Sequence, residues 1–216
     1  ESIEGNLSIS TWKSEVPLAV AGFAYGDFKF EENTAGAVTV GVYASKNPDD
    51  SMAMFEKISQ DGPYPGSSPQ PTAALGTLSP SALAKVMAQE VVNSINVFSH
   101  YFGPYPYKHL AVTNIPYSYG QGWPGLLYLS ALSFLDATQR NALGIRDMTG
   151  ITDFFRAHET SHQWWGHLIG WKSYHDQWLS EGFAQFSGNL YVQVRQNQKE
   201  YLDRLRRDKE ALKDSD

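Results

Sequence analysis

Two histidines four positions apart, with a glutamate beside the first, constrain this chain more than any other sequence feature. They form the segment HETSH, residues 158–162. On an α-helix, residues four apart share one face with Cβ atoms about 5–6 Å apart, so both imidazoles can reach one metal ion at about 2.0–2.1 Å. The residue pattern predicts a helix over residues 152–167. That helix has to turn one face toward a metal site.

Glu159 lies between the two histidines in sequence but not on the same face of the predicted helix. Its side chain is offset by about 100° from His158 and by about 60° from His162, so it flanks a metal without binding it. A carboxylate in that position can take a proton from water as a general base. A motif this short also arises by accident. The predicted helix, the aromatic residues that follow and a downstream carboxylate favour the metal site.

A metal hydrolase needs a third protein ligand and one open position. The pattern HExxHxxGxxH would place glycine at position 165 and histidine at position 168, but the chain has Trp165 and Leu168. His167 stands one residue too early and would face away from the two ligands on a continuing helix. We therefore interpret His167 as structural.

Glu181 is the better candidate for the third ligand. It lies in the segment WLSEGFA, residues 178–184, with eighteen residues between His162 and Glu181. That length allows the first helix to end near Gly166, the chain to turn through Gly170, and a second helix over residues 175–197 to return.

The stretch HETSHQWWGHLIGWKSYHDQWLSEGFA, residues 158–184, resembles the zinc signature of the aminopeptidase N family of gluzincin metallopeptidases. Two outer segments are similar as well. Residues 101–107, YFGPYPY, resemble the family's FGxPYP stretch, and residues 20–27 resemble the strand that ends its N-terminal β domain.

This resemblance implies a zinc peptidase. His158, His162 and Glu181 would bind one zinc ion, and Glu159 would act as the base that passes a proton from water to the leaving amine. The implied fold is α+β and thermolysin-like, a small mixed sheet followed by helices. Residues 1–28 would end a preceding β domain, and residues 29–216 would form a catalytic domain truncated at its C-terminus.

The sequence departs from the family in two places. The family's amine-recognition motif is GxMEN, whereas residues 119–125 here read YGQGWPG and contain no carboxylate. Gln121 and Trp123 could line a substrate pocket, but neither can pair with an ammonium group. The family's transition-state tyrosine also lies farther along than the 35 residues that follow Glu181. These departures leave open whether the enzyme cleaves at a free N-terminus or within a chain.

Short runs of β-branched and aromatic residues predict strands over residues 16–30, 37–44, 109–115 and 126–130, with a loop over 116–125. Helical spacing of apolar residues predicts a helix from Ser79-Pro80 to Gly103 and a charged one over 200–213. A short helix is expected over 52–58, followed by a Pro- and Gly-rich surface loop over 61–72.

Composition excludes several other classes of protein. The chain has no cysteine, which rules out disulfides, thiolate metal sites and cysteine nucleophiles. A net charge of −6 disfavours nucleic-acid binding, and no apolar run is long enough to span a membrane. The expected partner is a peptide or protein substrate. Compartment and oligomeric state stay open.

Some smaller features have two interpretations. Asp176 could orient a ligand histidine from behind, or it could cap a helix N-terminus. Tyrosines 101, 105, 107, 117 and 119 could line a substrate cleft or could pack in turns and core, and His100, His109 and His175 are interpreted as structural. As a whole, the sequence predicts a zinc metallopeptidase, with a non-catalytic peptide- or carbohydrate-binding module on the same scaffold as the alternative.

Overall fold

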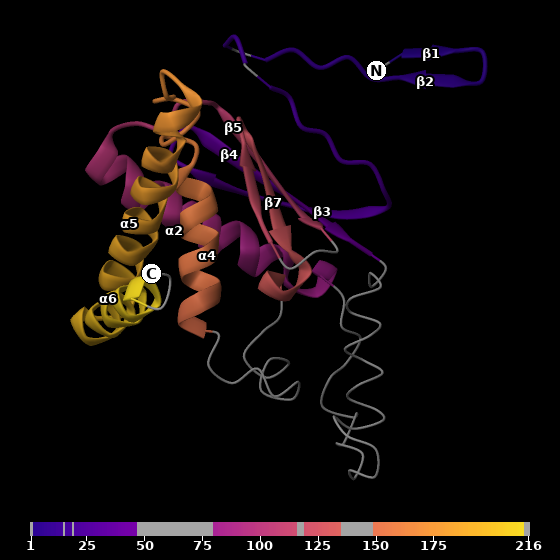
Figure 1. Cartoon of the computed structure of the whole chain (residues 1–216). Coiled ribbons are helices and arrows are strands. Elements are labelled where there is room, and N and C mark those ends of the chain that lie inside the picture. The colour runs from indigo at the N-terminus through magenta and orange to yellow at the C-terminus, as the bar shows by residue number, and fades with distance from the viewer. Residues whose placement is uncertain are drawn as a thin grey trace, which may run out of the picture.

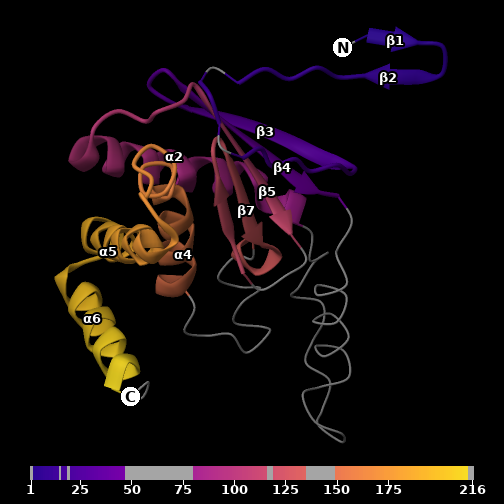
Figure 2. The ribbon, with the colours of Figure 1, turned by 45° about the horizontal axis from the view of Figure 1, so that its top comes forward.

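The computed structural model describes residues 2–14, 16–18, 20–46, 80–115, 119–134 and 149–213. The helix predicted over 52–58 and the loop over 61–72 lie outside the described residues. A five-stranded sheet stands beside a group of helices (Figure 1), and the view in Figure 2 shows the same two-part arrangement. Within the described residues, no helix is long and apolar enough to cross a membrane.

The sheet has the strand order β3-β4-β5-β7-β6. Its strands are β3 (Phe28–Ala35), β4 (Val38–Ser45), β5 (His109–Ile115), β7 (Leu126–Ser130) and β6 (Gln121–Trp123). The pairs β4–β5 and β5–β7 are parallel, and the outer pairs β3–β4 and β6–β7 are antiparallel. The central strands are β-branched and leucine-rich because helices cover them. The buried side chains there include Val40, Val42, Leu110, Val112, Leu127 and Leu129.

The helices follow the apolar spacing of the sequence. They are α2 (Ala84–Phe102), α4 (Thr149–Ser161), α5 (Gln177–Arg195) and α6 (Gln198–Lys213), with short 3-10 turns η2 (Pro80–Leu83), η3 (Ala131–Phe134) and η4 (Tyr174–Asp176). Helix α2 packs on β3, β4 and α4. Phe98 of α2 is fully buried against Trp164 and Tyr191, so one aromatic cluster joins the helices into a single core.

The predicted α+β class is confirmed, since a mixed sheet is followed by helices. The strands predicted over 109–115 and 126–130 are confirmed with the same bounds. The strand predicted over 16–30 is wrong up to residue 27. Its aromatic residues Phe23 and Tyr25 are 80% and 91% exposed, so no neighbouring surface covers them and strand β3 begins only at Phe28.

Two other expectations need correction. The predicted loop over 116–125 contains strand β6, which pairs with β7 across the turn at Pro124 and Gly125. The first metal helix ends at Ser161 and not near residue 167. The amides of Gln163 and Trp164 turn back to the carbonyls of Thr160 and Ser161, and the positive φ of Gly166 reverses the chain.

The N-terminal residues form a separate hairpin of β1 (Ser2–Glu4) and β2 (Leu7–Ile9), whose residues are all exposed. In Figure 1 it lies away from the five-stranded sheet. The division of the chain into residues 1–28 and 29–216 stays a prediction.

Candidate metal centre

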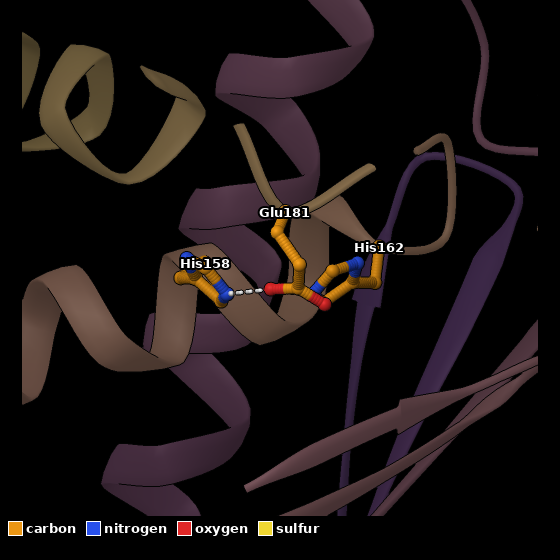
Figure 3. Close-up of side chains that lie close together, drawn as sticks. All are labelled: His158, His162 and Glu181. Atoms are coloured by element: carbon orange, nitrogen blue, oxygen red, sulfur yellow. Dashed lines mark ion pairs between the residues drawn. The ribbon is translucent and has the colours of Figure 1, made fainter. Parts of the chain in front are cut away.

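Three predicted ligands meet between α4 and α5. His158 lies in the last turn of α4, His162 directly follows its end, and Glu181 lies in the second turn of α5. One ligand atom from each residue lies within 4.8 Å of the other two. Figure 3 shows the Glu181 carboxylate between the two imidazoles, with its Oε2 atom 3.4 Å from His158 Nε2 and 3.6 Å from His162 Nε2.

This donor set fits a zinc ion. Ligand atoms about 2.0–2.1 Å from one tetrahedral ion lie roughly 3.4 Å from each other, close to the two separations between nitrogen and oxygen. Both histidines present Nε2 to the site, and the Nδ1 atom of His162 lies 3.0 Å from the Trp165 carbonyl oxygen. That hydrogen bond orients the ring, as a second partner of a metal-binding histidine usually does. Three protein ligands would leave a fourth position open.

Close packing of α5 on α4 brings Glu181 to the histidines. Gly188 of α5 lies against Phe154 of α4, and a Cβ atom at position 188 would lie 2.6 Å from the Phe154 ring. Trp165 stacks on Phe183 at 4.8 Å between ring centroids and donates its Nε1–H to Ser187 Oγ at 3.0 Å. The absence of a side chain at residue 188 allows the two helices to approach closely.

The charges of the three groups are coupled. Burial, followed by the charge of His162, lowers the pKa of His158 to about 4, so this imidazole is neutral and has a free lone pair at neutral pH. Burial opposes protonation of His162, but hydrogen bonds to Glu181 and to the Trp165 carbonyl outweigh it and raise its pKa. The hydrogen bond from His162, ahead of other effects, lowers the pKa of Glu181 and keeps it anionic.

Glu159 lies beside this group but is not part of it. It is buried, and burial raises its pKa to about 7, with the charge of Glu181 acting in the same direction. The charge of His162 and a backbone hydrogen bond from Gly122 partly oppose that shift. A carboxyl group with such a pKa can both accept and release a proton near neutrality.

Strand β6 lies directly against this part of α4. A Cβ atom at position 120 would lie 2.8 Å from Glu159 Oε1, and one at position 122 would lie 2.8 Å from His162 Cβ. The glycines of the segment GQGW therefore allow backbone to approach the site where a side chain would collide.

The two predicted substrate residues lie on this strand. Gln121 is exposed, and its Nε2 donates to the Gly122 carbonyl at 3.4 Å. Trp123 is half-buried, and its Nε1 atom is buried without a hydrogen-bond partner in the described part of the chain. Both residues thus lie on the strand that adjoins Glu159, and their contact with a substrate stays a prediction.

Asp176 hydrogen-bonds the backbone and side chain of Ser173 in a capping box at 3.0 and 2.9 Å. Among the described residues, no hydrogen bond joins it to His158 or His162, and His158 Nδ1 is buried without a partner. This geometry matches the capping interpretation of Asp176. His167 Nε2 lies 2.7 Å from the Gly122 carbonyl oxygen, a backbone contact within the fold.

The predicted tyrosine group is divided. Tyr105 is buried and packs edge to face on Tyr107 at 5.6 Å, whereas Tyr101 and Tyr119 are exposed and Tyr117 lies outside the described residues. Sequence reasoning missed Gln163, which is fully buried and bonds the backbone of Trp123 and Gly125. No sequence signal marks this glutamine, because its partners lie some forty positions earlier in the chain.

Comparison with known proteins gives consistent matches. The sequence model of the peptidase family M1 domain matches residues 87–215. The chain is 33% identical over 105 residues to rice aminopeptidase M1-C and 33% identical over 107 residues to human endoplasmic reticulum aminopeptidase 1. It is 30% identical over 148 residues to the leucyl aminopeptidase of Saccharolobus solfataricus.

These alignments cover 47%, 48% and 64% of this chain, but only 12%, 11% and 17% of the respective relatives. The chain thus spans a small part of the length of the curated relatives that it matches. Among solved structures, an M1 zinc metallopeptidase from Deinococcus radiodurans aligns with a TM-score of 0.48 and 19% identity, over 79% of this chain and 29% of that chain.

Proposed function

The chain belongs to peptidase family M1, as its resemblance to the aminopeptidase N family predicts, and from this premise we propose that it hydrolyses peptide bonds as a zinc peptidase. One observation carries the proposal. His158, His162 and Glu181 converge from two helices, while Glu159 lies buried beside them and outside the ligand group. A scaffold that served only to bind peptides would not need a buried carboxylate in that position.

The proposed mechanism assigns two tasks to the chain's own residues. His158, His162 and Glu181 would hold the zinc ion, which supplies Lewis acidity toward water and a peptide carbonyl. Glu159 accepts a proton from water at its carboxylate and releases it to the departing amine, and its pKa of about 7 suits both transfers. The backbone at Gly120 and Gly122 lies close against Glu159 and encloses its side chain.

Replacing Glu159 with glutamine tests this mechanism. The variant keeps the shape of the side chain and removes the base, so zinc content should stay at the wild-type level. Peptide hydrolysis should fall by about 10²–10⁴, the usual contribution of general acid–base catalysis. Zinc analysis and a fluorogenic peptide assay measure the two effects. Wild-type turnover in Glu159→Gln would contradict the mechanism, and a wild-type protein that binds peptides without cleaving them would favour the binding module.

We propose further that this chain has no firm requirement for a free substrate N-terminus. Several relatives are named aminopeptidases, but residues 119–125 of this chain contain no acid that could pair with an ammonium group. Glycine also stands at position 122 of strand β6 and at position 120 just before it, where a longer side chain would collide with α4.

Two versions of one reporter peptide test this point, the first with a free N-terminus and the second acetylated. Without an ion pair to the free amine, the two peptides should be cleaved at rates within about tenfold of each other. A tenfold ratio corresponds to about 1.4 kcal/mol. A preference of several hundredfold for the free amine would show that an acid outside residues 119–125 recognises it.

A further inference from the structure

Strand β6 is held against the metal helix through its backbone, by two side chains that follow the HETSH segment. Gln163 Nε2 donates to the Trp123 carbonyl at 2.8 Å, and Gln163 Oε1 accepts from the Gly125 amide at 2.8 Å. His167 Nε2 donates to the Gly122 carbonyl at 2.7 Å. Three backbone groups of the β6–β7 hairpin, in residues 122, 123 and 125, are thereby hydrogen-bonded to the chain just beyond α4.

This strand is short and lies at the edge of the sheet. It is three residues long and, among the described residues, pairs with β7. Its central residue is Gly122, preceded by Gly120, so these two positions contribute no side chain, whereas Trp123 is half-buried. Hydrogen bonds from Gln163 and His167 attach the strand at backbone groups near the glycines, where no side chain can pack.

The location of this attachment connects it to the candidate site. A Cβ atom at position 122 would lie 2.8 Å from the Glu159 carbonyl oxygen and from His162 Cβ, and the carbonyl of Gly122 accepts from His167. Gln163 is fully buried, and the Tyr105 hydroxyl also donates to its Oε1 atom at 3.4 Å. A buried amide that both donates to and accepts from the hairpin backbone is restricted in orientation, so it can hold the strand in one place.

We propose that Gln163 and His167 are positioning residues that hold strand β6 against α4, so that the backbone around Gly122 keeps its place beside the proposed base Glu159. The importance of this for catalysis rests on the proposed peptidase function. The attachment itself depends only on the described hydrogen bonds. If the two residues contributed only to general stability, substituting them would destabilise the whole fold and would not loosen this hairpin in particular.

Hydrogen–deuterium exchange separates these two roles. In Gln163→Met, which keeps the length of the side chain and loses its hydrogen bonds, exchange in residues 119–130 should become at least about tenfold faster, while α5 and α6 exchange as in wild type. Asn189→Leu is the matched control. Asn189 is also a buried amide, but it lies in the second half of α5 and hydrogen-bonds Arg204 and Asp208 of α6. This variant should accelerate exchange in α5 and α6 and leave residues 119–130 unchanged.

Substitution of His167 is an independent test of the proposal, and it remains available if Gln163→Met does not fold. His167→Leu should accelerate exchange in residues 119–130, and His167→Gln, which offers an amide N–H in a similar place, should restore most of the protection. In peptide hydrolysis, kcat of Gln163→Met and His167→Leu should fall about 10–100-fold with zinc content retained, the usual range for lost supporting contacts around a metal site.

The outcomes distinguish the two proposals. Unchanged exchange of residues 119–130 in both Gln163→Met and His167→Leu would overturn the positioning role. Equal loss of protection throughout the chain, without recovery in His167→Gln, would also overturn it. If exchange of residues 119–130 is faster in the variants but the wild-type protein hydrolyses no peptide, the positioning role is supported and the peptidase function is contradicted.

Discussion

The two helices that carry the proposed zinc ligands differ in how firmly the fold encloses their side chains. On the α4 side, the side chains of His158 and His162 are 15% and 9% exposed, and strand β6 lies against His162. On the α5 side, the Glu181 side chain is 59% exposed, and its neighbours Trp178 and Phe183 are also exposed. The first half of the site is therefore part of the core, whereas the second half depends on how α5 docks.

That docking is secured farther along α5. Residues 187–189, 191 and 192 are buried, and the Tyr191 hydroxyl donates to Glu90 of α2 at 3.2 Å. Gly188 allows the contact with Phe154. Thus the exposed ligand is positioned by a rigid helix whose anchor lies two to three turns away. Variants of the two halves should have effects of different kinds.

The largest effect is expected at the exposed ligand. Glu181→Ala leaves two protein ligands and should weaken zinc binding by at least about 100-fold, because even lost outer partners of a metal site cost 10–100-fold. Competition with a chelator measures the affinity. Glu210→Ala, an exposed glutamate at the end of α6, should bind zinc like wild type. Unchanged affinity in Glu181→Ala would show that a different residue is the third ligand.

A smaller effect tests the anchor of α5. Burial, and next the charge of Glu90, raises the pKa of Tyr191 to about 12, above the value near 10 in an unfolded chain. As pH rises through 10, the unfolded chain loses this proton first, so the free energy of unfolding should fall between about pH 10 and 12. Tyr191→Phe should make that decline shallower in urea titrations at pH 9, 10 and 11. A decline as steep as in wild type would contradict a buried anchor, and Tyr174→Phe on the surface is the control.

The smallest effects compare one glycine in each half, in protein stripped of zinc. Gly122→Ala places a methyl group 2.8 Å from His162 Cβ and should lower the free energy of unfolding by about 1–3 kcal/mol. Gly182→Ala meets no atom within 4 Å on the exposed side of α5 and should raise it by about 0.5–1 kcal/mol.

Chemical denaturation measures both free energies. Opposite signs are expected because position 122 has no room for a side chain, whereas position 182 has open space. A destabilised Gly182→Ala would mean that a neighbouring surface covers the start of α5, and a neutral Gly122→Ala would mean that β6 can move away from α4 at little cost.

Sequence reasoning succeeded where the relevant interactions are local or repeat regularly. Alternating and helical apolar patterns located β5, β7 and the helices, and motif spacing identified three residues that the fold brings together. It failed where the structure of a segment depends on what packs against it or pairs with it. The aromatic run before Phe28 has strand-like composition but no covering surface, and the glycine-rich loop before Pro124 forms a strand because β7 pairs with it.

The sequence by itself determined which side chains are available for the proposed chemistry, since the two histidines, the two glutamates and their spacing are properties of the chain. Only the tertiary structure decided how that chemistry is held. It ended α4 at Ser161, used Asp176 as a cap, and turned Gln163 and His167 toward strand β6. The physical reason is that a side chain's hydrogen-bond partner depends on which backbone atoms lie nearby in space, and for Gln163 and His167 those atoms belong to residues 38 to 45 positions earlier in the chain.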